Sequence, residues 1–190
     1  MKGMPVLQSP LLAVACGNEN SARLEDVTGQ FGLIHIQGEG ALDLLAQASG
    51  DGPHKPGDVF ANSSGLFVAL RPDVGVVLAS PAAAEALSSR LSTTAGEQLI
   101  IVDMTHGFGL LALAGPSAAS VLSRLCGLNF NARAFPNWHA AQTSLAKVRA
   151  LIVRADTGGV CRYLLAVDRS HAVYVWETLV DAVQEILADR

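Results

Sequence analysis

An internal duplication constrains the fold of this 190-residue chain more than any other feature of its sequence. Residues 26–50, DVTGQFGLIHIQGEGALDLLAQASG, align without a gap to residues 103–127, DMTHGFGLLALAGPSAASVLSRLCG, at an offset of 77 positions. Nine of the 25 aligned pairs are identical, and glycines and an Asp-x-Thr motif are among them. Such a repeat indicates that the same supersecondary unit is built twice.

Each copy predicts the same order of elements. The apolar runs 31–36 and 108–113 are typical of strands, and an amphipathic helix follows each of them after a glycine turn. Gly50 and Gly127 stand where C-terminal helix caps are expected.

Downstream of each copy, the segments 65–91 and 148–187 predict two further strands and a helix. The sequence therefore predicts one α+β domain over 1–190, with two pseudo-symmetric β-α-β-β-α halves at 24–95 and 101–187. Residues 1–23 form a lead-in.

The repeated Asp26-x-Thr28 and Asp103-x-Thr105 motifs precede the first strand of each copy. A short acidic side chain readily hydrogen-bonds a backbone group two residues away. We expect this structural role, which fixes the entry to each strand, rather than a catalytic one.

Charge and hydropathy exclude several classes of protein. The formal net charge is −4 and the 13 basic residues are scattered, so we expect no nucleic-acid partner. No apolar run approaches the ~20 residues of a membrane helix, so we expect no membrane partner. The three cysteines are widely spaced and form no zinc motif, which is typical of a reducing cytoplasm.

The sequence contains no complete catalytic site. No dinucleotide fingerprint, nucleophile elbow or paired-histidine motif is present. Among the five histidines, His106 and His139 are the best candidates for acid–base chemistry, but neither has a partner at a suitable spacing. We therefore assign no catalytic, cofactor-binding or metal-binding residue.

The segment 133–139 is the most distinctive loop, because it combines Arg133, Phe135, Trp138 and His139. Arginine and aromatic side chains anchor protein interfaces, so these four residues are predicted to contact a partner. The alternative is that the loop folds back and buries Phe135 and Trp138 in its own domain.

The second copy resembles the glycine-cleavage T-protein family in its Asp-x-Thr, Gly115-Pro116-x-Ala118 and helix signatures. The whole chain is more similar to the gamma subunits of heterotetrameric sarcosine oxidase. The specific stretches are Val102–His106, Arg133–Phe135, Ala141–Ala146 and Arg169–Ala172.

This resemblance implies the T-protein fold and a non-catalytic subunit. The complex would demethylate sarcosine oxidatively to glycine and hydrogen peroxide, and would pass the one-carbon unit to tetrahydrofolate. The implied partners are a large alpha-like subunit, a flavin-bearing beta-like subunit and a small delta-like subunit. Flavins, NAD and tetrahydrofolate are expected on these partners, and no cofactor on this chain.

Two departures from folate-active T-proteins accompany the resemblance. The Asn62-Ser63-Ser64-Gly65 turn is followed by no carboxylate, and Thr157-Gly158-Gly159 lacks the glutamate of the family's Thr-Gly-Glu signature. Two alternatives stay open at this point: a free-standing folate-binding, aminomethyltransferase-like protein, and a homo-oligomer without a small ligand.

Overall fold

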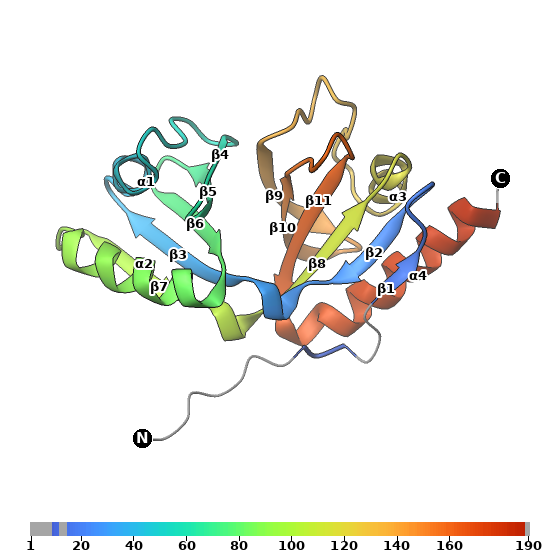
Figure 1. Ribbon diagram of the computed structural model, residues 1–190, viewed down its shortest axis with the longest axis horizontal. Helices are drawn as coiled ribbons and strands as arrows, with labels where there is room; N and C mark the ends of the chain where they lie inside the picture. Colours follow the sequence, from blue (N-terminus) through green and yellow to red (C-terminus); the bar gives the residue numbers. More distant parts are fainter. Residues whose placement is uncertain (1–8, 12–14, 189–190) are drawn as a thin grey trace.

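The computed structural model describes residues 9–11 and 15–188, and it consists of two antiparallel sheets with helices on their outer faces (Figure 1). The layers run helix, sheet, sheet, helix. One buried cluster lies between the sheets, and one lies between each sheet and its helices. Residues 1–8 and 12–14 of the predicted lead-in lie outside the described residues.

The five-stranded sheet belongs mainly to the first copy of the repeat. Its strands are, in spatial order, β4 (Val59–Asn62), β5 (Gly65–Arg71), β6 (Val74–Ala79), β3 (Gly32–Gly38) and β7 (Leu99–Asp103). Its outer face is covered by α1 (Ala41–Ser49) and α2 (Pro81–Thr94).

The six-stranded sheet belongs mainly to the second copy. Its strands are, in spatial order, β1 (Ala15–Gly17), β2 (Arg23–Asp26), β8 (Phe108–Ala114), β11 (Arg162–Asp168), β10 (Val148–Arg154) and β9 (His139–Leu145). Its outer face is covered by α3 (Ala118–Leu125) and α4 (Ala172–Ala188). Three short 3₁₀ turns complete the fold: η1 (Thr28–Gln30), η2 (Thr105–Gly107) and η3 (Arg169–His171).

The predicted α+β class is confirmed, and every predicted strand and helix of the two halves is present. The predicted cap at Gly50 is confirmed, since this residue is left-handed with φ 96°. The cap at Gly127 is wrong: α3 ends at Leu125, and Cys126 is already extended. Five strands, β1, β2, β4, β7 and β9, are additional.

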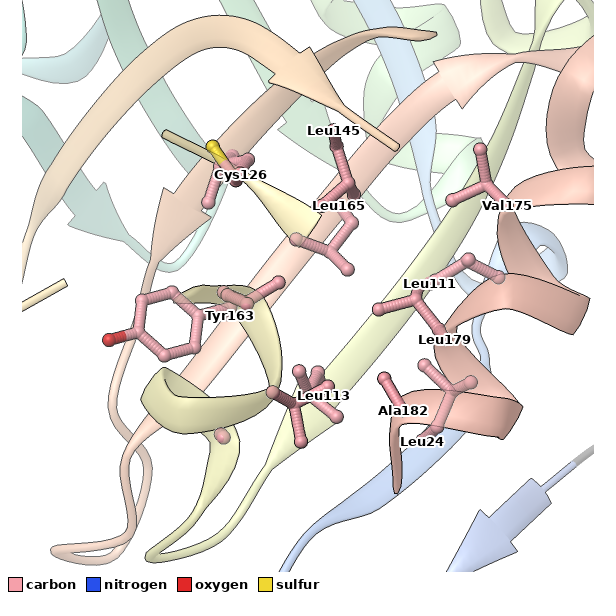
Figure 2. Close-up of a cluster of buried hydrophobic side chains, with 14 of the residues drawn as sticks. Leu24, Leu111, Leu113, Cys126, Leu145, Tyr163, Leu165, Val175, Leu179 and Ala182 are labelled. Atoms are coloured by element: carbon pink, nitrogen blue, oxygen red, sulfur yellow. The ribbon is translucent and has the colours of Figure 1, made fainter. Parts of the chain in front are cut away.

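The two copies exchange strands across the molecule. β2 opens the first copy but pairs with β8 of the second, and β7 opens the second copy but pairs with β3 of the first. Figure 2 shows the result for the core, where Leu24 of β2 packs near Leu111 and Leu113 of β8 and Leu179 of α4. Neither sheet is therefore built from one sequence half alone.

The Asp-x-Thr motifs stabilise this strand exchange through hydrogen bonds. The Thr28 amide donates to Asp26 Oδ1 at 3.0 Å, and the Thr105 amide donates to Asp103 Oδ1 at 2.9 Å, which confirms the predicted backbone role. Each threonine hydroxyl then reaches the opposite copy. The Leu110 amide donates to Thr28 Oγ1, and the Leu33 amide donates to Thr105 Oγ1, both at 3.0 Å.

Replacing Thr28 with valine is expected to destabilise the fold by about 1–3 kcal/mol, because the isosteric side chain leaves the buried Leu110 amide without an acceptor. Thr28 is 2% exposed, whereas Thr105 is half-buried, so Thr105→Val should cost less. Urea unfolding of the two variants beside Thr28→Ser, which keeps the hydroxyl, measures the difference. Equal losses for both valine variants would contradict this explanation.

Two equivalent glycines lie where the exchanged segments pass close to the sheets. Gly38 and Gly115 have φ of +131° and +120°. A Cβ on Gly38 would lie 2.0 Å from the Gln98 carbonyl oxygen, and one on Gly115 would lie 2.5 Å from that of Ser21. The same tight approach thus occurs once in each half, and it explains why both copies of the repeat keep glycine there.

Candidate ligand clefts and partner surface

The first candidate site, which we term the turn cleft, lies between the sheets beside the β4–β5 turn. It has a volume of about 290 Å³. The Asn62–Gly65 turn forms one side, and on the side of the other sheet Arg162 of β11 and the loop residues Trp138 and Thr157 contribute. The structure therefore brings together the two motifs that depart from the folate-active pattern, although they lie almost a hundred positions apart in the sequence.

The chemistry of the turn cleft is that of hydrogen-bond donors without a carboxylate. Among the described residues that line it, none is acidic. Arg162 is half-buried, and this burial lowers its guanidinium pKa while the charge of Glu25 acts in the opposite direction. A carboxylate is the group expected to orient or deprotonate a folate amine. The described lining offers no such group, so these residues do not fit tetrahydrofolate.

The second candidate site, the histidine cleft, lies between the sheets toward the other end of β5 and has a volume of about 270 Å³. Its floor is apolar, with Leu33, Val76 and Leu151. Its polar lining consists of His35, Gln142, Arg149 and Asp168. The Arg149 guanidinium donates to Gln142 Oε1 at 2.8 Å, and Asp168 Oδ1 accepts from the Ser170 amide at 2.8 Å.

The two titratable groups of the histidine cleft have shifted pKa values. Burial lowers the pKa of His35, and the charges of Arg149 and Arg71 lower it further. Hydrogen bonds from Ser170 lower the pKa of Asp168. Both shifts favour fixed protonation states at neutral pH, with His35 neutral and Asp168 ionised. A ligand in the histidine cleft would therefore meet a neutral imidazole and an ionised carboxylate.

Folding stability is expected to decrease as the pH falls below the ordinary histidine pKa of 6.5, in part because of His35. Below this value His35 binds a proton more readily in the unfolded chain than in the folded chain. Folding stability therefore rises with pH through the window below 6.5. Urea unfolding at pH 7.5 and 5.5 measures the loss, which should be smaller in His35→Gln. An unchanged pH dependence in that variant would contradict the assignment.

The two histidines favoured by the sequence lie in different environments. His106 is exposed in η2. The His139 ring stands edge-on to Phe135 with ring centroids 5.0 Å apart, and it fills the space beside Gly57. Within residues 9–11 and 15–188, no group of three or more His, Cys, Asp or Glu side chains is placed to hold a metal ion.

The structure separates the four residues of the predicted partner surface. Phe135 is 3% exposed and packs against Phe130 and Tyr163, so this residue belongs to the core, as the alternative interpretation proposed. Arg133 is exposed, His139 is half-buried, and the Trp138 side chain is 41% exposed. Partner contact therefore stays a prediction for Arg133, Trp138 and His139 only.

Trp138 is held in an unusual conformation that presents its indole at the turn cleft. Its φ is 61°, which is rare for a bulky residue. Its amide donates to the Arg154 carbonyl at 3.1 Å, and its carbonyl accepts from the Val59 amide at 3.0 Å. Sequence reasoning missed that Trp138 and Arg162 share one cleft, because no local pattern connects this loop to the start of β11, which lies two strands further along the chain.

Comparison with known proteins identifies the family. The model of the GCVT N-terminal domain matches residues 61–188, which is more than half of the chain. Sarcosine oxidase subunit gamma of Corynebacterium sp. strain P-1 is 32% identical over 164 residues, covering 84% of this chain and 78% of the relative. The chain belongs to the sarcosine oxidase gamma-subunit family. The gamma subunit of Corynebacterium sp. strain U-96 is 31% identical over 188 residues, covering 96% of this chain and 89% of the relative.

Solved structures agree with this membership. A chain of the heterotetrameric sarcosine oxidase from Corynebacterium sp. U-96 matches with a TM-score of 0.75 at 26% identity, covering 90% of this chain and 88% of that chain. Aminomethyltransferase T of the glycine cleavage system from Bartonella henselae matches with a TM-score of 0.67 at 20% identity, covering 85% of this chain and 46% of its own. The second likeness shows the shared fold of the gamma-subunit family and the aminomethyltransferases.

None of the described helices is long and apolar enough to cross a membrane.

Proposed function

We propose that this chain is a non-catalytic gamma subunit of a cytoplasmic complex that oxidatively demethylates sarcosine to glycine and hydrogen peroxide, with one-carbon transfer to tetrahydrofolate. The observation that carries the proposal is the correspondence over almost the whole length of a sarcosine oxidase gamma subunit, 96% of this chain against 89% of the relative. The flavins, NAD and tetrahydrofolate belong to the alpha-like and beta-like partners in this proposal, and a small delta-like subunit completes the complex.

The chemistry of the turn cleft supports a non-catalytic role. A free-standing aminomethyltransferase needs a carboxylate at the folate amine, and the lining of the turn cleft supplies none. Isothermal titration of the isolated chain with tetrahydrofolate should therefore give no binding heat. Saturable heat that is lost in Arg162→Ala would favour the aminomethyltransferase alternative.

Co-purification tests the assembly directly. The tagged chain, expressed in its own host, should retain larger subunits, and the eluate should carry a flavin absorption spectrum and sarcosine-dependent hydrogen peroxide production. The isolated chain should produce none. A colourless eluate without partners would overturn the proposal.

The exposed indole of Trp138 is part of the proposed contact with a partner, together with Arg133 and His139. Exposed tryptophans are enriched among the residues that dominate binding energy, so Trp138→Ala should weaken assembly by about tenfold or more. Val160→Ala serves as the matched control, because Val160 is similarly exposed at 46% but lies outside this segment. Equal retention of partners by both variants would remove Trp138 from the interface.

A further inference from the structure

The duplication offers an internal comparison for one surface of the molecule. The offset of 77 that relates the two copies places Arg23 and Glu25 of β2 against Ile100 and Val102 of β7. The structure agrees with this correspondence. Arg23 lies opposite Ala114 of β8, and Ile100 lies opposite Gln37 of β3, where Ala114 and Gln37 are themselves 77 positions apart. β2 and β7 are thus equivalent strands in equivalent places.

The outer edges of these two strands differ. On β2, the outer edge pairs antiparallel with β1, with Ala15 opposite Glu25 and Gly17 opposite Arg23. On β7, no strand from the described part of the chain pairs with the outer edge. An edge strand of this kind presents unpaired N–H and C=O groups that template the addition of another strand.

The exposed side chains of the two strands differ in polarity. The Arg23 and Glu25 side chains form an ion pair at 2.6 Å, which suits a surface in contact with water. At the equivalent positions, Ile100 is 63% exposed and Val102 is 43% exposed. Exposed β-branched residues on an apolar edge strand are what soluble proteins avoid unless the edge is covered.

The remaining ends of the two sheets are already protected. β4 and β9 close on each other, because the Val59 amide donates to the Trp138 carbonyl and the Ala140 amide donates to the Gly57 carbonyl. β1 is only three residues long, and a very short edge strand is a poor template. β7 therefore stands out among the edges of the described chain.

We propose that the outer edge of β7 pairs with an extended, antiparallel strand of a partner subunit, in the place that β1 occupies on β2. This inference rests on the proposed function, since the partner is a larger subunit of the oxidase complex. The three partner residues opposite Ile100, Ile101 and Val102 take the positions of Gly17, Cys16 and Ala15. Apolar side chains of the same partner cover Ile100 and Val102.

The test transfers the charges of β2 to β7. The double variant Ile100→Arg, Val102→Glu should fold as well as the wild type by thermal denaturation, because β2 carries the same pair. It should bind the co-expressed flavin-bearing subunits about 100-fold more weakly, since the loss of two central apolar contacts at an interface has this order of effect. The matched control is Val160→Arg, Val173→Glu, since both valines are 46% exposed elsewhere. This control should assemble within threefold of wild type.

Hydrogen exchange separates strand pairing from simple side-chain coverage. In the assembled complex, amides within residues 100–103 should exchange at least ~10-fold more slowly than in the free chain, because pairing engages the outward N–H groups. Wild-type assembly by the β7 variant, or unchanged exchange at 100–103 in the complex, would overturn the inference and leave the proposed function intact.

Two other results also decide the matter. Light scattering can show that the free wild-type chain is a dimer and that the β7 variant is a monomer. In that case the strand on the edge of β7 would come from a second copy of this chain instead of a partner subunit. A wild-type chain that retains no flavin-bearing subunit would overturn the proposed function and this inference with it.

Discussion

Replacing Gly38 with alanine is expected to destabilise the protein by about 4 kcal/mol or more, which approaches the whole stability of many domains. The new Cβ would lie 2.0 Å from the Gln98 carbonyl oxygen, which is a backbone atom and cannot rotate away. The segment leading into β7 would have to move outward, and β7 would then lose its register on β3. Circular dichroism during urea unfolding measures the effect.

Gly40→Ala is the matched control for that variant. Gly40 also has a positive φ, of 86°, but a Cβ there would meet nothing within 4 Å. Its substitution carries only the cost of a left-handed alanine, about 1–2 kcal/mol. If both alanine variants lost the same stability, backbone conformation rather than the close approach of the exchanged segment would explain Gly38.

Replacing Arg154 with alanine is the second large effect, with an expected loss of about 3 kcal/mol. Arg154 and Asp156 form two parallel hydrogen bonds of 3.0 Å, and their side chains are only 12% and 20% exposed. The same guanidinium donates to the Phe135 carbonyl at 2.7 Å. Removing it leaves a poorly hydrated carboxylate and releases the loop that holds Trp138. Urea unfolding and the fluorescence of Trp138 and Trp176 measure the two consequences.

The first half of the molecule contains the matched pair. Arg71 and Asp73 occupy the same place at the β5–β6 turn, with N–O distances of 3.1 and 3.4 Å, but their side chains are 56% and 52% exposed. Solvated ion pairs contribute about 0–1 kcal/mol, so Arg71→Ala should be nearly neutral. Comparable losses in the two variants would show that burial is not the decisive difference.

The sequence predicts the repeated elements well because each of them carries its own periodicity. The apolar run of β8 and the helical stripe of Ala118, Val121, Leu122 and Leu125 are local signals. The first three of these helix residues are buried, and Leu125 is half-buried. The Asp-x-Thr motif also has a local explanation, since its first hydrogen bond spans two residues.

The pairing of the strands is not a local property, and the sequence does not reveal it. β2 has four residues and β7 has five, too few for a clear alternation. Their partners lie far away along the chain, since Leu24 pairs with Leu113. β9 has seven residues, but its His-Ala-Ala-Gln-Thr-Ser-Leu sequence contains small and polar residues that conceal a strand.

The candidate site shows the same division. The sequence already shows that no carboxylate follows the Asn62–Gly65 turn, because the residue types in a motif can be read without coordinates. The sequence does not show that Phe135 is buried and Trp138 is exposed. An aromatic residue in a loop suits an interface and a core equally well, and the two residues lie only three positions apart. Only the contacts with Phe130, Tyr163 and Arg154 assign them to different roles.

The exchange of β2 and β7 has a consequence for how such a protein arises. A half-length chain with one copy of the repeat would carry its opening strand but have no place for it in its own sheet. Two such chains would each complete the other's sheet, so the stable form of the half-length protein would be an obligate, arm-exchanged homodimer. In that view, gene fusion joined two protomers that already depended on each other. The copies then diverged, so that β2 kept β1 as a covering strand, while no strand of the described chain pairs with the outer edge of β7.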